Sequence, residues 1–211
     1  MTQNQNNIII LGGGGHARVL IDLILSSGHF NILGILDSRQ TENFLNIPVL
    51  GNDDLLPDLY TQGVRQAVIG VGSVKDNSKR NALYQAVKQL GFSIPPLIHP
   101  KAILSESNII LSEGVQVMAG AIIQPNVFLG ENVIINTGAI IDHDCRIENN
   151  AFIAPGVTIS GGVSIGENAF IGAGATILQG LKIGKDSLVA AGALVINDVP
   201  DKAIVMGVPA K

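Results

Sequence analysis

A chain of 211 residues, 46% of them hydrophobic and 14% charged, is long enough for one large domain or two small ones. Its formal net charge of −4 argues against a nucleic-acid-binding surface. A single cysteine excludes an internal disulfide and fits a reducing compartment. The 25 glycines and the low aromatic content suit a solenoid filled by small and branched aliphatic side chains.

The first predicted element is a short apolar strand at 7–11, which ends in the turn Gly12-Gly13-Gly14-Gly15-His16-Ala17. A helical pattern follows and stops near Gly28, with its apolar face expected to carry Val19, Leu20, Leu23 and Ile24. The apolar strand is too short for a signal peptide or a membrane span. We therefore expect a soluble cytoplasmic protein with no membrane partner.

Two further strands are predicted at 32–36 and 66–71, followed by a helix at 77–90. Strands that alternate with helices predict a small parallel α/β sheet. The proline-rich stretch that follows the last helix breaks its pattern and marks a domain boundary. We predict a Rossmann-like, nucleotide-sugar-binding domain over residues 1–98 and a second domain over 99–211.

The glycine turn suggests a binding mechanism. Glycines after a strand let backbone N–H groups face a phosphate at a helix N-terminus. The spacing Gly12-x-Gly14-x-x-Ala17 fits the dinucleotide fingerprint, and Asp37 lies where an acid can hold a ribose hydroxyl. Residues 1–98 leave room for one βαβαβ half, which favours a nucleoside diphosphate sugar over NAD. A glycine turn that binds nothing, and Asp37 as a plain strand-end cap, remain alternatives.

Other ionisable residues are expected to be structural. Arg80 could reach a phosphate, but we expect it to be an exposed helix residue, with His29 and His99 at the surface or the domain boundary. Cys145 falls at an inward position of the repeat described next, so it is predicted to fill the core. His, Cys and carboxylate residues show no metal-ligand spacing, and we expect no metal.

The second domain has a hexapeptide repeat. Every sixth residue from Leu111 to Val195 is a branched aliphatic, and the residue two positions before each is small or β-branched in nearly every hexad. This period belongs to parallel β-helices. Two inward residues flank one outward residue in each hexad, and three hexads close one coil. Residues 18 apart therefore stack at the ~4.8 Å strand spacing.

The outward residues predict an oligomer. Two faces of the prism are apolar or mixed and the third is largely polar. The first face carries Ile134, Phe152, Phe170 and Leu188, and the second carries Ile122, Ile140, Thr158, Thr176 and Leu194. The third, polar face carries Phe128, Arg146, Ser164 and Lys182. A stripe of large apolar residues normally marks a partner surface. A triangular prism would bury two faces in a closed ring, so we predict a homotrimer over a monomer with an apolar wall.

Ionisable groups cluster on the prism at Ile141-Asp142-His143-Asp144-Cys145. His143 and Asp144 occupy a corner between hexads and project outward. Histidine is readily poised as a general base near neutral pH, and a neighbouring carboxylate can fix its tautomer. Gly161 stands 18 residues further on, where its N–H can face a developing oxyanion. The alternative is a solvent-exposed corner histidine.

Taken in order, five motifs give the chain a family resemblance: the glycine turn, Leu97-Ile98-His99-Pro100, the His143 corner, Asn197-Asp198-Val199-Pro200 and Gly207-Val208-Pro209-Ala210-Lys211. The whole chain resembles bacterial sugar acyltransferases of the sialic acid O-acetyltransferase family. That family includes the UDP-4-amino-sugar N-acetyltransferases of bacillosamine-type pathways.

The resemblance implies a left-handed β-helix and a trimer that binds acetyl-CoA between neighbouring prisms. It implies that His143 is the catalytic base, Asp144 its supporting acid, and Gly161 the donor to the thioester carbonyl. Nucleotide-sugar contacts are implied at Gly14, Gly15, His16, Asp37, Ser38 and Gly72. Acetyl-CoA contacts are implied at Phe152, Gly161, Ala173 and Ala191.

Two departures from the family pattern concern specificity. Many relatives carry a second histidine nine residues after the base, where this chain has Phe152, so a side-chain hydrogen bond to acetyl-CoA is lost there. Asp37-Ser38 replaces a pair of acids found in some members, which affects any transfer of sugar specificity.

We predict direct acetyl transfer from acetyl-CoA to the amino group of a nucleotide-linked deoxysugar, such as a UDP-4-amino-4,6-dideoxy sugar, for surface glycan or glycoprotein synthesis. The first alternative is sugar O-acetylation. A nicotinamide-dependent oxidoreductase, which would use the glycine turn and Asp37, is a second. A non-catalytic scaffolding or ice-binding prism is a third, but it would need a flat face of repeated Thr or Asn.

Overall fold

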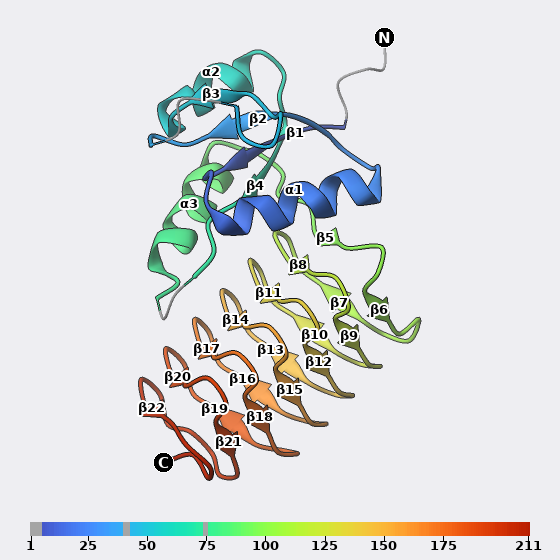
Figure 1. Ribbon diagram of the computed structural model, residues 1–211, viewed down its shortest axis with the longest axis vertical. Coiled ribbons are helices and arrows are strands. Elements are labelled where there is room, and N and C mark those ends of the chain that lie inside the picture. The colour runs from blue at the N-terminus through green and yellow to red at the C-terminus, as the bar shows by residue number, and fades with distance from the viewer. Residues whose placement is uncertain (1–5, 40–42, 74–75) are drawn as a thin grey trace.

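The computed structural model describes residues 6–39, 43–73 and 76–211. The first five residues of the predicted first domain therefore lie outside the described residues. Figure 1 shows an α/β unit seated on one end of a long prism of stacked coils. The α/β unit holds a parallel four-stranded sheet in the order β3-β2-β1-β4, built from β1 (Asn7–Leu11), β2 (Asn31–Leu36), β3 (Val49–Gly51) and β4 (Gln66–Ile69).

Helices cover this sheet, with bounds α1 (Gly15–Ser27), α2 (Leu56–Thr61), α3 (Ser78–Gln89) and a short 3₁₀ turn η1 (Asp53–Leu55). The apolar run of β1 is buried on both faces, as a central parallel strand requires. Gly28 ends α1 at φ 67°, a left-handed conformation that glycine adopts without strain. The sequence analysis missed β3 and α2, which are short elements with no sustained periodicity.

The prism begins at residue 97, and its strands form three walls. The seven-stranded wall holds β5 (Leu97–Ile98), β8 (Gln116–Val117), β11 (Ile134–Ile135), β14 (Phe152–Ile153), β17 (Phe170–Ile171), β20 (Leu188–Val189) and β22 (Ile204–Val205). The six-stranded wall holds β6 (Ile103–Leu104), β9 (Ile122–Ile123), β12 (Ile140–Ile141), β15 (Thr158–Ile159), β18 (Thr176–Ile177) and β21 (Leu194–Val195). The five-stranded wall holds β7 (Ile110–Leu111), β10 (Phe128–Leu129), β13 (Arg146–Ile147), β16 (Ser164–Ile165) and β19 (Lys182–Ile183).

The predicted register of 18 residues is confirmed. Ile134 pairs with Phe152, and Phe152 with Phe170, in parallel ladders. The inward aliphatic residues are buried, and Cys145, 1% exposed, fills the core among them as predicted. Asn, Asp and Gly recur at the corners because the backbone there has φ near +60°, where other side chains are strained.

The two apolar stripes have different surroundings. Phe152, Phe170 and Leu188 of the seven-stranded wall line a pocket against the α/β unit, so this stripe serves the chain's own cavity. On the six-stranded wall, Ile103 is 63% exposed and Ile140 38% exposed. The stripe on the six-stranded wall therefore keeps exposed apolar residues in the single chain.

Two sequence interpretations are wrong, those of Arg80 and Val19, whereas His99 lies at the domain boundary as expected. Arg80 is 2% exposed, because it lies under the end of β4 with its guanidinium against backbone carbonyls. His99 is 6% exposed, since the domain junction covers it, and its Nδ1 accepts a hydrogen bond from the Lys101 N–H. Val19, expected on the buried face of its helix, is 40% exposed and lines the pocket.

Contacts between the α/β unit and the prism are polar as well as apolar. The Lys88 ammonium lies 2.7 Å from Glu131 and 3.3 Å from Glu113, and the Tyr84 hydroxyl donates to Glu131. Asn77 donates from Nδ2 to the Asn150 carbonyl on the prism. Within the described ranges, no helix is long and apolar enough to cross a membrane.

Candidate functional site

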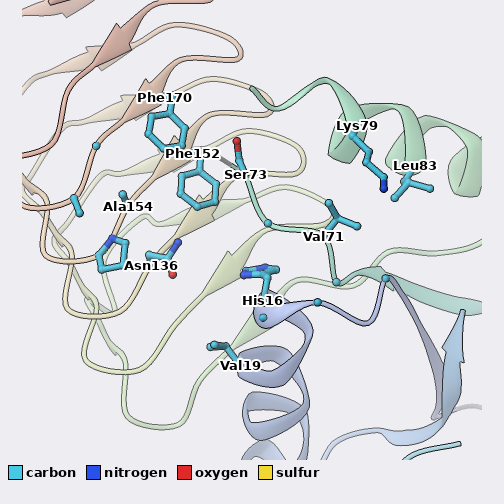
Figure 2. Close-up of a pocket in the computed structure, with 18 of the residues that line it drawn as sticks. His16, Val19, Val71, Ser73, Lys79, Leu83, Asn136, Phe152, Ala154 and Phe170 are labelled. Atoms are coloured by element: carbon cyan, nitrogen blue, oxygen red, sulfur yellow. The ribbon is translucent and has the colours of Figure 1, made fainter. Parts of the chain in front are cut away.

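A pocket of about 960 Å³ lies between the α/β unit and the seven-stranded wall. Figure 2 shows His16, at the start of α1, facing the wall that carries Phe152 and Phe170. Nine sequence-predicted residues line this one pocket: Gly14, Gly15, His16, Asp37, Ser38, Gly72, Phe152, Ala173 and Ala191. Segments far apart in the chain therefore build a single cavity.

The glycine turn opens the start of α1 to this pocket. Gly12 has φ +98° and donates its N–H to the Leu36 carbonyl, and a Cβ on it would lie 2.6 Å from the Val71 side chain. Only glycine fits that close approach. A Cβ on Gly14 or Gly15 would meet no atom within 4 Å, so open space faces the helix start. Backbone N–H groups at a helix N-terminus suit an anion such as a diphosphate.

Asp37 supports this turn. Its Oδ2 accepts a hydrogen bond of 2.7 Å from the Gly13 N–H, and its Oδ1 accepts one from the Arg39 N–H. The carboxylate lines the pocket with only 9% of the residue exposed. Asp37 thus holds the turn in place, and the ribose contact expected from the sequence stays a prediction.

His16 is bound to the prism through one hydrogen bond. Its Nε2 lies 2.8 Å from Oε1 of Gln116, and the Gln116 Nε2 donates to the Ile69 carbonyl at 3.0 Å. Burial is the main cause that lowers the pKa of His16 to about 4, and the nearby Arg80 charge lowers it further. His16 is therefore neutral at physiological pH.

Arg80 lies behind the loop that follows β4. Its Nη1 donates to the carbonyls of Ile69 and Val71, at 2.9 and 3.0 Å. Burial lowers the pKa of the guanidinium to about 9. Its Nε and Nη2 have no hydrogen-bond partner among the described residues. A buried positive charge beneath this loop favours an anionic ligand in the pocket above it.

The opposite side of the pocket is apolar. Phe152 and Phe170 stack with ring centroids 5.1 Å apart and planes 3° apart. Ala173 and Ala191 are exposed corner residues one coil apart that border the same cavity. Small side chains at these corners leave backbone groups accessible to a ligand that runs along the prism. The sequence analysis missed Asp53 and Lys79, which line the polar end of the pocket.

The predicted catalytic residues occupy a different corner, between the six- and five-stranded walls. His143 Nδ1 lies 2.7 Å from Oδ2 of Asp144, so Nδ1 carries the proton when the ring is neutral and Nε2 is the basic nitrogen. The hydrogen bond to Asp144 is the main cause that raises the pKa of His143, and the charge of Asp142 adds to it. Both side chains are about half exposed in the single chain.

Gly161 lies directly next to the His143 ring. A Cβ on Gly161 would stand 2.6 Å from Cε1 and from Nε2 of His143. Its φ is not in the left-handed region, unlike that of Gly162 at +70°, so the requirement for glycine here is space for the ring. The Gly161 N–H donates no backbone hydrogen bond within the described residues. The basic ring of His143 and Gly161, whose N–H donates no backbone hydrogen bond in the described part of the chain, therefore lie in contact at one corner.

Asn126 is a site residue that the sequence analysis missed. Its Nδ2 donates to Oδ1 of Asp144 at 3.0 Å and thereby orients the carboxylate whose other oxygen faces His143. Asn126 stands 18 residues before Asp144, so the coil period contained the signal that could have identified it. The same hydrogen bond contributes to a lowered pKa of Asp144, after the larger effect of His143.

Comparison with known proteins identifies both parts of the chain. Residues 7–87 match the PglD N-terminal domain, and residues 126–161 and 162–197 match the bacterial transferase hexapeptide (six repeats). The structure resembles perosamine N-acetyltransferase from Caulobacter crescentus in complex with CoA and GDP-perosamine: 40% identity, 98% of this chain and 96% of that chain covered, TM-score 0.92. The chain belongs to the hexapeptide-repeat sugar N-acetyltransferases.

Two further solved structures are similar to this chain over their whole length. The acetyltransferase domain of PglB from Neisseria gonorrhoeae in complex with acetyl coenzyme A is 35% identical, with 98% of each chain covered and a TM-score of 0.91. WeeI from Acinetobacter baumannii is 25% identical, with 97% of this chain and 98% of that chain covered and a TM-score of 0.79. A comparison with curated protein sequences finds no match. The expected fold is confirmed, a small parallel α/β sheet followed by a left-handed β-helix.

Family membership decides against the nicotinamide oxidoreductase and the non-catalytic prism. No group of three or more His, Cys, Asp or Glu residues in the described part of the chain could hold a metal ion. The acyltransferase relatives were crystallised with CoA or acetyl coenzyme A.

The close contact between Gly161 and the His143 ring allows a mutational test of the predicted catalytic residues. We expect Gly161→Ala to lower kcat roughly 10²-fold. The new methyl group would displace the His143 ring, and a displaced catalytic group loses rate by about this factor. Gln179→Ala, one coil further along the same column of corners, is the matched control and should retain near wild-type kcat. Steady-state kinetics with circular dichroism measures both; full activity in Gly161→Ala would contradict the assignment.

Proposed function

We propose that this protein transfers the acetyl group of acetyl-CoA to the amino group of a nucleoside-diphosphate-linked amino-deoxysugar. The observation that supports this most directly is the contact between His143 and Gly161, which places a basic nitrogen and a free N–H donor side by side. The relatives bound to GDP-perosamine and to acetyl coenzyme A support the same reaction class. Because the relative bound to GDP-perosamine is an N-acetyltransferase, we favour N-acetylation over O-acetylation.

The pocket supplies the nucleotide end of this proposal. The open start of α1 would hold the diphosphate, the buried Arg80 charge would favour it, and Asp37 and Ser38 would contact the ribose. Gly72 leaves space for His16, since a Cβ on it would lie 3.1 Å from the His16 Cβ. CoA would run past Phe152, Ala173 and Ala191 along the prism.

The steps of acetyl transfer follow from the arrangement of His143, Asp144 and Gly161. His143 Nε2 removes a proton from the attacking amine, while Asp144 holds Nδ1–H and stabilises the charged ring. The amine nitrogen bonds to the thioester carbon, and the Gly161 N–H stabilises the oxyanion. The C–S bond then breaks, and the CoA thiolate leaves and takes up a proton. The products are the N-acetylated sugar and CoA.

The separation of pocket and corner implies an active site shared between subunits. His143, Asp144 and Gly161 are not among the residues that line the pocket of the same chain. The exposed apolar stripe of the six-stranded wall, with Ile103 and Ile140, lies beside the His143 corner. We propose a homotrimer in which this wall packs on a neighbour and brings His143 of one subunit to the pocket of the next. A cytoplasmic location belongs to the same proposal, because acetyl-CoA is its co-substrate.

Incubation with acetyl-CoA and a panel of UDP- and GDP-linked amino-deoxysugars and their hydroxyl analogues, reading free thiol, tests the reaction. We expect thiol release with one or more amino-sugars and a loss of ~10²–10⁴-fold in kcat for His143→Ala, since a general base is worth that factor. Size-exclusion chromatography checks that the variant keeps its assembly. Near-normal turnover in His143→Ala would remove the base assignment.

The pKa of His143 predicts a pH effect. Only the neutral ring accepts a proton, so kcat/KM should rise with pH through the pKa of His143, which Asp144 holds above its ordinary value. In Asp144→Asn the carboxylate charge is lost and the pKa of His143 falls. The acidic limb of the kcat/KM profile should therefore move to lower pH, with a lower plateau because the base is weaker. An unmoved limb would show that another group titrates.

Mixed trimers test the shared site. His143→Ala lacks the base, and Gly72→Leu fills the pocket, so each homotrimer should have little activity. Co-expressed with different tags, a mixed ring contains one interface with an intact pocket beside an intact base. We expect up to a third of the wild-type activity in tag-purified mixed trimers. No recovery above the parent variants would place the site within one subunit.

A further inference from the structure

Gln116 is a polar exception on an apolar wall. The other residues in the same column of the seven-stranded wall are Leu97, Ile134, Phe152, Phe170, Leu188 and Ile204. Gln116 is nevertheless 1% exposed, because the α/β unit covers it. Burial of an amide is unfavourable unless its groups are hydrogen bonded, and both ends of this side chain have partners in the α/β unit.

The identity of those partners fixes the orientation of the Gln116 amide. The Ile69 carbonyl can only accept, so the amide NH₂ group must face it, at 3.0 Å. The Gln116 oxygen must then face His16 Nε2, at 2.8 Å. A flipped amide would set oxygen against oxygen at Ile69. Because the amide oxygen can only accept, Nε2 of His16 has to be the protonated nitrogen.

The other ring nitrogen is left for a ligand. In the neutral Nε2–H tautomer, Nδ1 is an acceptor, and it has no hydrogen-bond partner within the described residues. It lies on the Gly72 side, 3.7 Å from where a Gly72 Cβ would be, and both residues line the pocket.

The positive charge of Arg80 helps to keep the His16 ring neutral. The buried Arg80 guanidinium acts on His16 and disfavours a second positive charge on the ring. Asp37, Asp53 and Lys79 are charged residues that line the same pocket as His16. Arg80 and Gln116 also share the Ile69 carbonyl as their acceptor. The two side chains therefore form one buried unit behind the ring.

We propose that Gln116 is a positioning residue that holds His16 in the Nε2–H tautomer, so that His16 Nδ1 accepts a hydrogen bond from a hydroxyl or amino group of the bound nucleotide sugar. The identity of that donor rests on the proposed function; the tautomer does not. An unprotonated Nδ1 cannot bind a phosphate oxygen, which is itself an acceptor. The diphosphate is then left to the N–H groups at the start of α1, and His16 recognises a sugar donor instead.

Long-range ¹H–¹⁵N NMR of the full-length protein labelled with [¹⁵N]histidine tests the tautomer directly. The His16 signals are assigned by their loss in His16→Asn. At pH 7 and 8 we expect a pyrrole-like Nε2 and a pyridine-like Nδ1, with no titration until the pH approaches 4. A protonated Nδ1, or titration near the ordinary histidine pKa, would overturn the proposal.

Two substitutions separate positioning from domain bridging. Gln116→Glu keeps an oxygen acceptor for His16, whereas Gln116→Met has none, and both remove the amide donor to Ile69. We expect Gln116→Glu to keep the tautomer at pH 8. Gln116→Met should lose it and raise KM for the nucleotide sugar roughly tenfold, the worth of about one hydrogen bond, with kcat and KM for acetyl-CoA little changed.

Equal behaviour of the two variants in NMR and in KM would assign Gln116 to domain bridging and overturn the positioning role. The NMR result is independent of turnover. If the wild-type protein acetylated no nucleotide amino-sugar, the proposed function would fail while the tautomer could still be read.

Discussion

The stacking of corner on corner every 18 residues is the constraint on which this structure depends. Each coil has to close with its aliphatic residues inward, so between residues 110 and 195 each residue is stacked on the one 18 positions later. That repeat sets Gly161 against His143 and Asn126 against Asp144. The site is thus a local variation in the side chains of a rigid column, and the prism needs no special backbone to form it.

The proposed function assigns binding and chemistry to different elements. The α/β unit provides a helix start, a buried arginine and a neutral histidine around one pocket, all suited to an anionic ligand with hydrogen-bond donors. The prism provides an exposed base at a corner that does not line this pocket. Because this corner does not line the pocket of its own chain, the proposed function has a second copy bring its corner to the pocket, which links assembly to catalysis.

Several residues and short elements show why part of the structure could not be predicted from the sequence. Arg80 was expected in solvent because helical arginines usually are, but the loop after β4 covers it and supplies two carbonyl acceptors. Val19 follows the helical period of its neighbours, and yet it is 40% exposed because it borders the pocket between the helix and the prism. β3 and α2 are too short for periodicity to reveal, and the sheet holds β3 through pairing with β2.

The sequence by itself determined the β-helix, its register, the inward place of Cys145 and the pairing of His143 with Gly161, because a strict six-residue period leaves only one way to stack. The glycine turn and the order of strands and helices likewise determined the α/β unit. Only the tertiary structure decided that Gln116 reaches His16, that Arg80 is buried, and which apolar stripe remains exposed. These facts depend on how the α/β unit sits on the prism, and contacts between residues about 100 positions apart leave no periodic trace in the chain.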